Sequence, residues 1–89
     1  MYLTSDLPKE GYYDSESQYQ YIYPESDWVE DEKIGLLIIG AAGCDGVLFG
    51  LKKDDRKIWV HYPINNEARL IADSYIEFIS GWRAGSLKV

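Results

Sequence analysis

The sequence predicts an α+β fold, a small antiparallel β-sheet with a C-terminal helix packed on one face. Short alternating or apolar segments, separated by turns rich in glycine, proline and aspartate, predict the strands. Apolar residues at helical spacing near the C-terminus predict the helix. With 89 residues the chain can bury one modest core, so we expect a single domain.

The N-terminal third is expected to contribute an arm and then a first strand. Residues 1–16 contain Pro8 and Gly11 among polar side chains without apolar periodicity, which predicts an acidic arm or loop. Residues 17–23 alternate in polarity, as a half-buried strand does. One face of this strand would carry three tyrosines, Tyr19, Tyr21 and Tyr23.

A short helical turn and a glycine hairpin are expected next. Ser26 is a suitable N-cap for a turn over residues 27–30, and the acidic residues of that turn would lie near its positive end. The apolar run 34–39 has the length of a strand that is buried on both faces. Residues 40–46 contain three glycines and an Asp-Gly pair, which predicts the turn before a returning strand at 47–51.

The C-terminal half is expected to form a second hairpin and the helix. Residues 57–62 alternate after the charged turn at 52–56, whereas 67–72 is compatible with a short strand or with a lead-in to the helix. Ser74 and Glu77 have the spacing of a capping box. Four apolar residues would then share one helical face, Tyr75, Phe78, Ile79 and Trp82.

These elements divide the chain into three regions. The helix is expected to end at Gly81 or Gly85, since glycine commonly terminates helices. We therefore expect an arm or loop at 1–16, one domain at 17–85 and a tail at 86–89.

The composition limits the chemistry that the chain can perform. Cys44 is the only cysteine, so no internal disulfide can form, and one cysteine with one histidine cannot make a four-ligand zinc site. We expect no metal and no other cofactor. The longest apolar run, 34–43, is too short to span a bilayer, and residues 1–10 lack the features of a secretory signal. These features predict a cytoplasmic protein without membrane contact.

The charge is concentrated in the N-terminal third. Residues 1–32 contain nine carboxylates and one lysine, a net charge of −8, whereas the remaining residues contain eight basic and six acidic side chains, a net charge of +2. Because nucleic-acid affinity comes largely from basic side chains, direct nucleic-acid binding is not expected. An acidic surface favours a basic protein partner. The alternative is that these charges only keep the protein soluble.

Catalysis is the weakest of the functional hypotheses. His61 is the one side chain that titrates near neutrality without perturbation, and Cys44 is the one thiol nucleophile. The sequence supplies no third group to orient this pair. We therefore predict that the protein is not an enzyme and assign no catalytic residue.

The glycine turn supports a second hypothesis, a small-molecule or anion binder beside His61 and Trp59. A backbone nest could form in residues 40–46, but no lysine and helix follow as in phosphate-binding loops. The residues of this loop are Gly40, Gly43, Asp45 and Gly46.

A protein-binding surface is the leading hypothesis. The run 30–32 lacks the ligand spacing of a calcium loop, so it is expected to be a solvated charge cluster and not a metal site. Tyrosines supply large contact areas at interfaces, although core packing is an equal explanation for them. The candidate partner-binding residues are Tyr19, Tyr21, Asp27, Trp28, Glu30, Asp31 and Glu32.

Four blocks in order resemble the SMI1/KNR4 family, also called the SUKH superfamily. They are YIYPE at 21–25, GLLIIGAAGCDGVLFG at 35–50, IWV at 58–60 and IADSYIEFI at 71–79. At its front the chain lacks the helices usual in the family and keeps only Leu7-Pro8 of its first motif, so it resembles a minimal or N-terminally shortened member.

The resemblance implies an interaction protein. Bacterial members of this family resemble immunity proteins that neutralise a cognate toxin, often a nuclease, and fungal relatives are regulatory scaffolds. We therefore expect a non-enzymatic binding module for a basic, nuclease-type toxin or another protein, with its oligomeric state left open.

Overall fold

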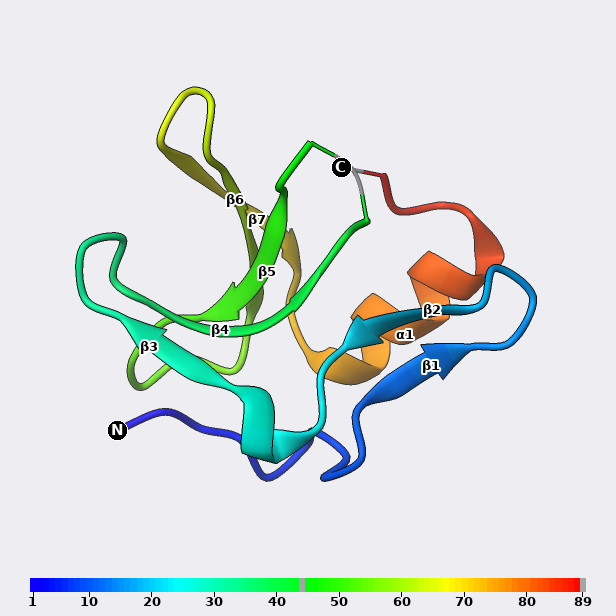
Figure 1. The fold of residues 1–89 in the computed structure, drawn as a ribbon. Coiled ribbons are helices and arrows are strands. Elements are labelled where there is room, and N and C mark those ends of the chain that lie inside the picture. The colour runs from blue at the N-terminus through cyan, green and yellow to red at the C-terminus, as the bar shows by residue number, and fades with distance from the viewer. Residues whose placement is uncertain (44, 89) are drawn as a thin grey trace.

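The structure, a computed structural model, describes residues 1–43 and 45–88. Within them it contains an antiparallel sheet of seven strands, one 3-10 turn and one C-terminal helix (Figure 1). This confirms the predicted α+β class. The elements are β1 (Tyr12–Asp14), β2 (Tyr19–Ile22), η1 (Glu25–Asp27), β3 (Val29–Asp31), β4 (Leu36–Ala41), β5 (Leu48–Leu51), β6 (Ile58–Tyr62), β7 (Glu67–Ala72) and α1 (Tyr75–Ala84).

The strands follow the order β1-β2-β4-β5-β6-β7, and β3 pairs with β4 on the same edge as β2. Ile22 of β2 lies opposite Gly40, while Val29 of β3 lies opposite Ile38. The two short strands therefore share one long strand. Gly40 permits this arrangement, because a Cβ atom there would lie 1.9 Å from the carbonyl oxygen of Tyr21.

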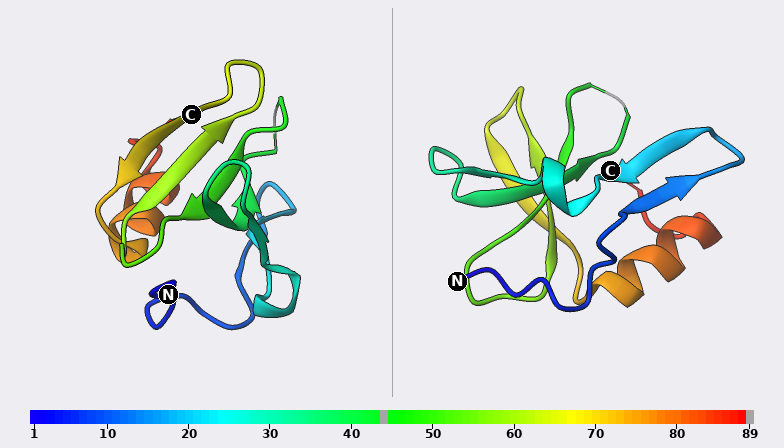
Figure 2. Two further views of the ribbon diagram at one scale, coloured as in Figure 1. Left: turned by 90° about the vertical axis from the view of Figure 1, so that its left-hand side faces the viewer. Right: turned by 60° about the horizontal axis from the view of Figure 1, so that its bottom comes forward.

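The sheet bends around the helix, so that β2, next to one end of the strand order, and β7, at the other end, both contact α1 (Figure 2). Tyr21 of β2 packs against Trp82 of the helix with ring centroids 5.2 Å apart. At the other end, β7 contacts the helix directly. Phe49 of β5 and Phe78 of α1, both fully buried, form the centre of the core at a centroid distance of 4.8 Å.

The helix has the predicted ends and the predicted apolar face. The Glu77 amide donates to the Ser74 hydroxyl at 3.2 Å, which satisfies one of the free amides of the first turn. Gly85 ends the helix with a φ of 76°, in the left-handed region that glycine adopts readily. The four predicted residues of the apolar face, Tyr75, Phe78, Ile79 and Trp82, all belong to the core or pack against it.

The first 16 residues are more ordered than the predicted arm or loop. Residues 12–14 form β1, and Leu7 is buried in the core at 8% exposure. Backbone hydrogen bonds hold the rest, because the Asp54 amide donates to the Met1 carbonyl and the Glu25 amide to the Lys9 carbonyl. The expectation of an arm or loop did not include the strand at 12–14, since the long-range contacts of this segment have no local signature.

The segment after β2 also differs from the prediction. The helical turn exists as the 3-10 turn η1, but its N-cap is Pro24 and no side chain caps it, so Ser26 does not have the expected role. Val29 and Glu30, expected in that turn, lie in β3 instead. Pairing with β4 provides the hydrogen bonds that make this three-residue segment a strand. For residues 67–72 the structure selects the strand, β7.

Candidate protein-interaction surface

One face of the sheet, here called the outer face, points away from the buried core. Because directly paired residues of antiparallel strands point to the same side, the registers place a row of residues across five strands on this face. We call it the outer row, and it consists of Val29, Ile38, Gly50, Trp59 and Leu70. None of these residues belongs to the core cluster. An apolar row outside the core is a candidate contact surface.

The ends of the outer row are open to solvent, and its centre is partly filled. Val29 is 62% exposed and Leu70 is 43% exposed. At the centre, the fully buried Leu36 lies over Gly50, where a Cβ atom would come within 3.2 Å of its Cδ1 atom. The absence of a side chain at Gly50 therefore leaves room for Leu36, which fills the middle of the outer face.

Trp59 is the large side chain of the outer row, and charged neighbours hold it in place. The Lys52 ammonium lies 3.7 Å from the ring centroid, a cation-π contact, and the indole nitrogen donates to the Asp55 carboxylate at 3.3 Å. A half-buried, fixed tryptophan loses little conformational entropy when a partner covers it.

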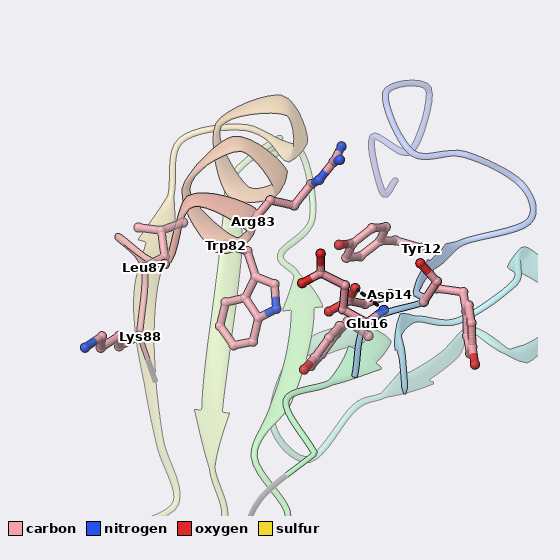
Figure 3. Close-up of a pocket in the computed structure, with 11 residues that line it drawn as sticks. Tyr12, Asp14, Glu16, Trp82, Arg83, Leu87 and Lys88 are labelled. Atoms are coloured by element: carbon pink, nitrogen blue, oxygen red, sulfur yellow. Dashed lines mark hydrogen bonds between the residues drawn. The ribbon is translucent and has the colours of Figure 1, made fainter. Parts of the chain in front are cut away.

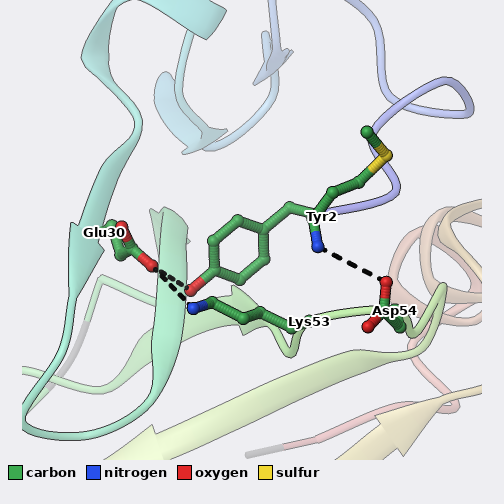
Figure 4. A network of polar contacts seen from close by, with 5 residues as sticks. Tyr2, Glu30, Lys53 and Asp54 are labelled. Atoms are coloured by element: carbon green, nitrogen blue, oxygen red, sulfur yellow. Dashed lines mark hydrogen bonds and ion pairs between the residues drawn. The ribbon is translucent and has the colours of Figure 1, made fainter.

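The row ends at the acidic strand β3, where Glu30 tethers the N-terminal segment (Figure 4). Its carboxylate accepts a hydrogen bond from the Tyr2 hydroxyl at 2.8 Å and lies 3.8 Å from the Lys53 ammonium. Partial desolvation and this hydrogen bond raise the pKa of Tyr2 above its usual value. Nearby, the N-terminal amine lies 3.4 Å from Asp54. Glu30, predicted as a partner-binding residue, therefore also has a structural contact.

The other predicted acidic residues divide into two kinds. Asp31 shapes the turn between β3 and β4, because its carboxylate accepts hydrogen bonds from the Lys33 and Ile34 amides at 3.0 and 3.4 Å. Asp27 and Glu32 are exposed, and their side chains form no hydrogen bond or ion pair with any other described residue. These two carboxylates are available to a partner.

The predicted aromatic residues are packed more closely than the acidic ones. Tyr21 lies between Tyr12, at 6.2 Å, and Trp82, and Tyr19 packs against it at 4.8 Å. Trp28 is half-buried, and its indole nitrogen donates to the Tyr23 carbonyl at 2.8 Å. The structure therefore places the tyrosine face beside the helix, apart from the outer row.

The glycine turn borders a small hollow of 190 Å³, which is lined by Tyr19, Ala41, Gly43, Asp45, Gly46 and Val47. Gly40 lies in β4 and supports strand packing. Neither His61 nor Trp59 lines this hollow, and Asp45 contributes a negative charge to it. These features do not favour an anion at this turn.

Of the two residues of the catalytic hypothesis, His61 and Cys44, the structure describes only His61. His61 is buried at 7% exposure, its Nε2 atom lies 3.1 Å from the Asn66 amide oxygen, and its Nδ1 atom has no hydrogen-bond partner among the described residues. Cys44 lies outside those residues. Within residues 1–43 and 45–88, no group of three or more metal-ligating side chains is gathered.

Sequence reasoning did not find the outer row. Val29 was placed in a helical turn, and the run 34–39 shows no alternation that separates Ile38 from the core side. The signal that was available is the alternation in 57–62, which sets Trp59 opposite to Ile58 and Val60.

Comparisons with protein-family models, with curated proteins and with solved structures found no match. In the described part of the chain, no helix has the length and apolar character needed to cross a membrane.

Proposed function

We propose that this chain is a non-enzymatic protein-binding module whose partner is a basic protein, and that its outer face is the binding surface. The proposal includes membership in the SMI1/KNR4 family, as the four sequence blocks suggest, and a cytoplasmic location. Within that family the corresponding role is neutralisation of a cognate basic toxin of the nuclease type.

The outer row carries the proposal. It is an apolar strip with a fixed tryptophan, outside the core, and it ends at a strand flanked by unpaired carboxylates. Interfaces combine apolar and aromatic residues at the centre with polar residues around them. The exposed carboxylates of Asp27 and Glu32 at the Val29 end support a basic partner, because complementary charges favour association.

The apolar residues and the carboxylates of this surface affect different steps of binding. Desolvation of Trp59, Ile38 and Leu70 stabilises the complex and mainly sets the dissociation rate. The carboxylates attract a basic partner over a distance and mainly set the association rate. The outer face is distinct from the cluster of Tyr12, Tyr19 and Tyr21, in which Tyr21 packs against Trp82 of the helix.

Affinity capture from the native host with wild-type and variant protein tests the proposal. Val29→Asp and Leu70→Asp place charges on exposed positions of the outer row, and Ile76→Asp is the matched control on an exposed helix position, 70% exposed. We expect one basic protein to be captured by wild type and by the control. After purification, it should bind each outer-row variant about tenfold more weakly, because a charge would then replace an apolar contact in the interface.

Two results would overturn the proposal. One is capture of the same proteins, with equal affinity, by all four forms of the chain. The other is concentration-dependent dimerisation of wild type in sedimentation experiments that Leu70→Asp abolishes, which would make the outer face an interface between two copies.

A further inference from the structure

A groove of 570 Å³ lies between the β1–β2 hairpin and the C-terminal end of the helix (Figure 3). Its volume is in the range of small-molecule sites, about 300 to 1,000 Å³. Tyr21 and Trp82, in edge-to-face contact, supply its aromatic surface together with Tyr12. No residue of the outer row lines it, so the groove is separate from the proposed partner surface.

The two walls of the groove carry opposite charges. Asp14 and Glu16 lie on the hairpin wall and Arg83 lies on the helix wall, whereas the Lys88 side chain, also at the helix wall, extends away from the groove (Figure 3). None of the four forms an ion pair with another described residue. Hydrogen bonds from the Ser17 hydroxyl at 2.9 Å and from the Glu16 amide at 3.1 Å fix the Asp14 carboxylate at the end of the hairpin.

Charges of both signs act on the same point inside the groove. Burial raises the pKa of the Tyr12 hydroxyl, the charge of Asp14 raises it further and the charge of Arg83 lowers it. In Figure 3 the Arg83 side chain extends from the helix toward the side of the groove that Tyr12 forms. A ligand beside this hydroxyl would therefore be within the electrostatic influence of both charged side chains.

The helix wall depends on two glycines. Gly85 reverses the chain with a φ of 76°, and the Ser86 and Leu87 amides both donate to the Gly81 carbonyl, at 2.9 and 3.2 Å. A Cβ atom at Gly81 would lie 2.5 Å from the Leu87 Cγ atom, so only glycine lets the chain fold back this closely. The segment 86–88, expected to be a tail, is thereby held beside the groove.

We propose that this groove binds an amino acid or a dipeptide in its zwitterionic form, with its apolar side chain against the aromatic surface. The ligand ammonium lies toward Asp14 and Glu16, and the ligand carboxylate lies toward Arg83. A ligand with a single charge satisfies one wall and leaves the other without a partner. The outer-face proposal and this one are independent.

Three probes that share one ring but differ in charge test the proposal. L-phenylalanine carries both charges, phenethylamine carries only the ammonium and 3-phenylpropionate carries only the carboxylate. Each is titrated into the 89-residue chain, and the amide and indole resonances are followed by NMR. We expect L-phenylalanine to bind with a Kd of about 1 mM, given its size, and each analogue to bind about three- to tenfold more weakly.

Variants of each wall test separately which wall binds the ammonium and which binds the carboxylate. Glu16→Gln should weaken phenethylamine and leave 3-phenylpropionate unchanged, and Arg83→Gln should do the reverse. Lys57→Gln, in the distant turn before β6, is the matched control and should bind all three probes as wild type does. The dipeptide Gly-Phe distinguishes an amino-acid site from a dipeptide site. If Gly-Phe binds more tightly than L-phenylalanine does, the groove is a site for dipeptides.

The proposal is overturned if the resonance of the Trp82 indole shows no saturable shift with L-phenylalanine or with Gly-Phe at about ten times the expected Kd. It is also overturned if the zwitterion binds no more tightly than its singly charged analogues.

Discussion

The rings of Phe49 and Trp82 meet edge to face, with centroids 5.4 Å apart and planes at 85°. This contact joins the central strand β5 to the last turn of the helix. The same indole also contacts Tyr21 on β2, so one side chain links the core, the hairpin and the groove. Packing of the helix therefore determines both the stability of the domain and the shape of the groove.

Phe78→Ala should destabilise the protein by about 3 to 5 kcal/mol, because it leaves a cavity beside Phe49 in a small core. Urea denaturation followed by circular dichroism measures the change. Ile76→Ala on the exposed side of the same helix is the control and should change stability by about 0.5 kcal/mol. Equal effects of the two substitutions would show that the helix face is assigned incorrectly.

Gly40→Ala should destabilise the protein by about 3 kcal/mol, since the new methyl group would force β2 away from β4 at the Tyr21 carbonyl. Gly35→Ala is a useful comparison, because Gly35 has a φ of 72° and open space around it. Its cost should be limited to backbone strain of about 1 to 2 kcal/mol. A smaller effect at Gly40 than at Gly35 in the same denaturation experiment would contradict the close approach of the two strands.

Tyr75 should make the protein sensitive to alkaline pH. Burial, with contributions from Tyr12 and Glu10, raises the pKa of Tyr75 to about 12 from 10.0. Between these values the unfolded chain has lost a proton that the folded chain retains, so stability falls as pH rises through this window and is unaffected by this group below it.

Melting temperatures measured across that window should fall less steeply for Tyr75→Phe than for wild type. Tyr13→Phe, at a position that is 53% exposed, serves as the control. Parallel curves for wild type and Tyr75→Phe would mean that another group causes any alkaline loss of stability.

The parts of the fold that the sequence predicted are those with local signals. The helix has a capping residue, a glycine terminator and an apolar face, all within residues 74–85. The two predicted hairpins, β4–β5 and β5–β6, join segments that are close in sequence. β1 and β3 were missed because each has three residues, and β3 depends on pairing with β4.

The candidate surface was predictable only in part. The acidic residues around β3 were visible as a charge cluster, but the structural roles of Glu30 and Asp31 depend on contacts with Tyr2 and with a turn. The outer row requires the strand registers, because its residues come from five strands. Composition and spacing do not encode that alignment directly.

The most direct test of the central claim is the association rate with the purified basic partner, measured by stopped flow at two salt concentrations. The Debye length falls from about 10 Å at 0.1 M to about 3 Å at 1 M, so high salt should slow association of wild type. Asp27→Lys/Glu32→Lys should lower the rate at low salt by about tenfold or more, whereas the matched reversal Glu67→Lys/Asp73→Lys should not. An association rate unaffected by salt and by the first double variant would contradict the account.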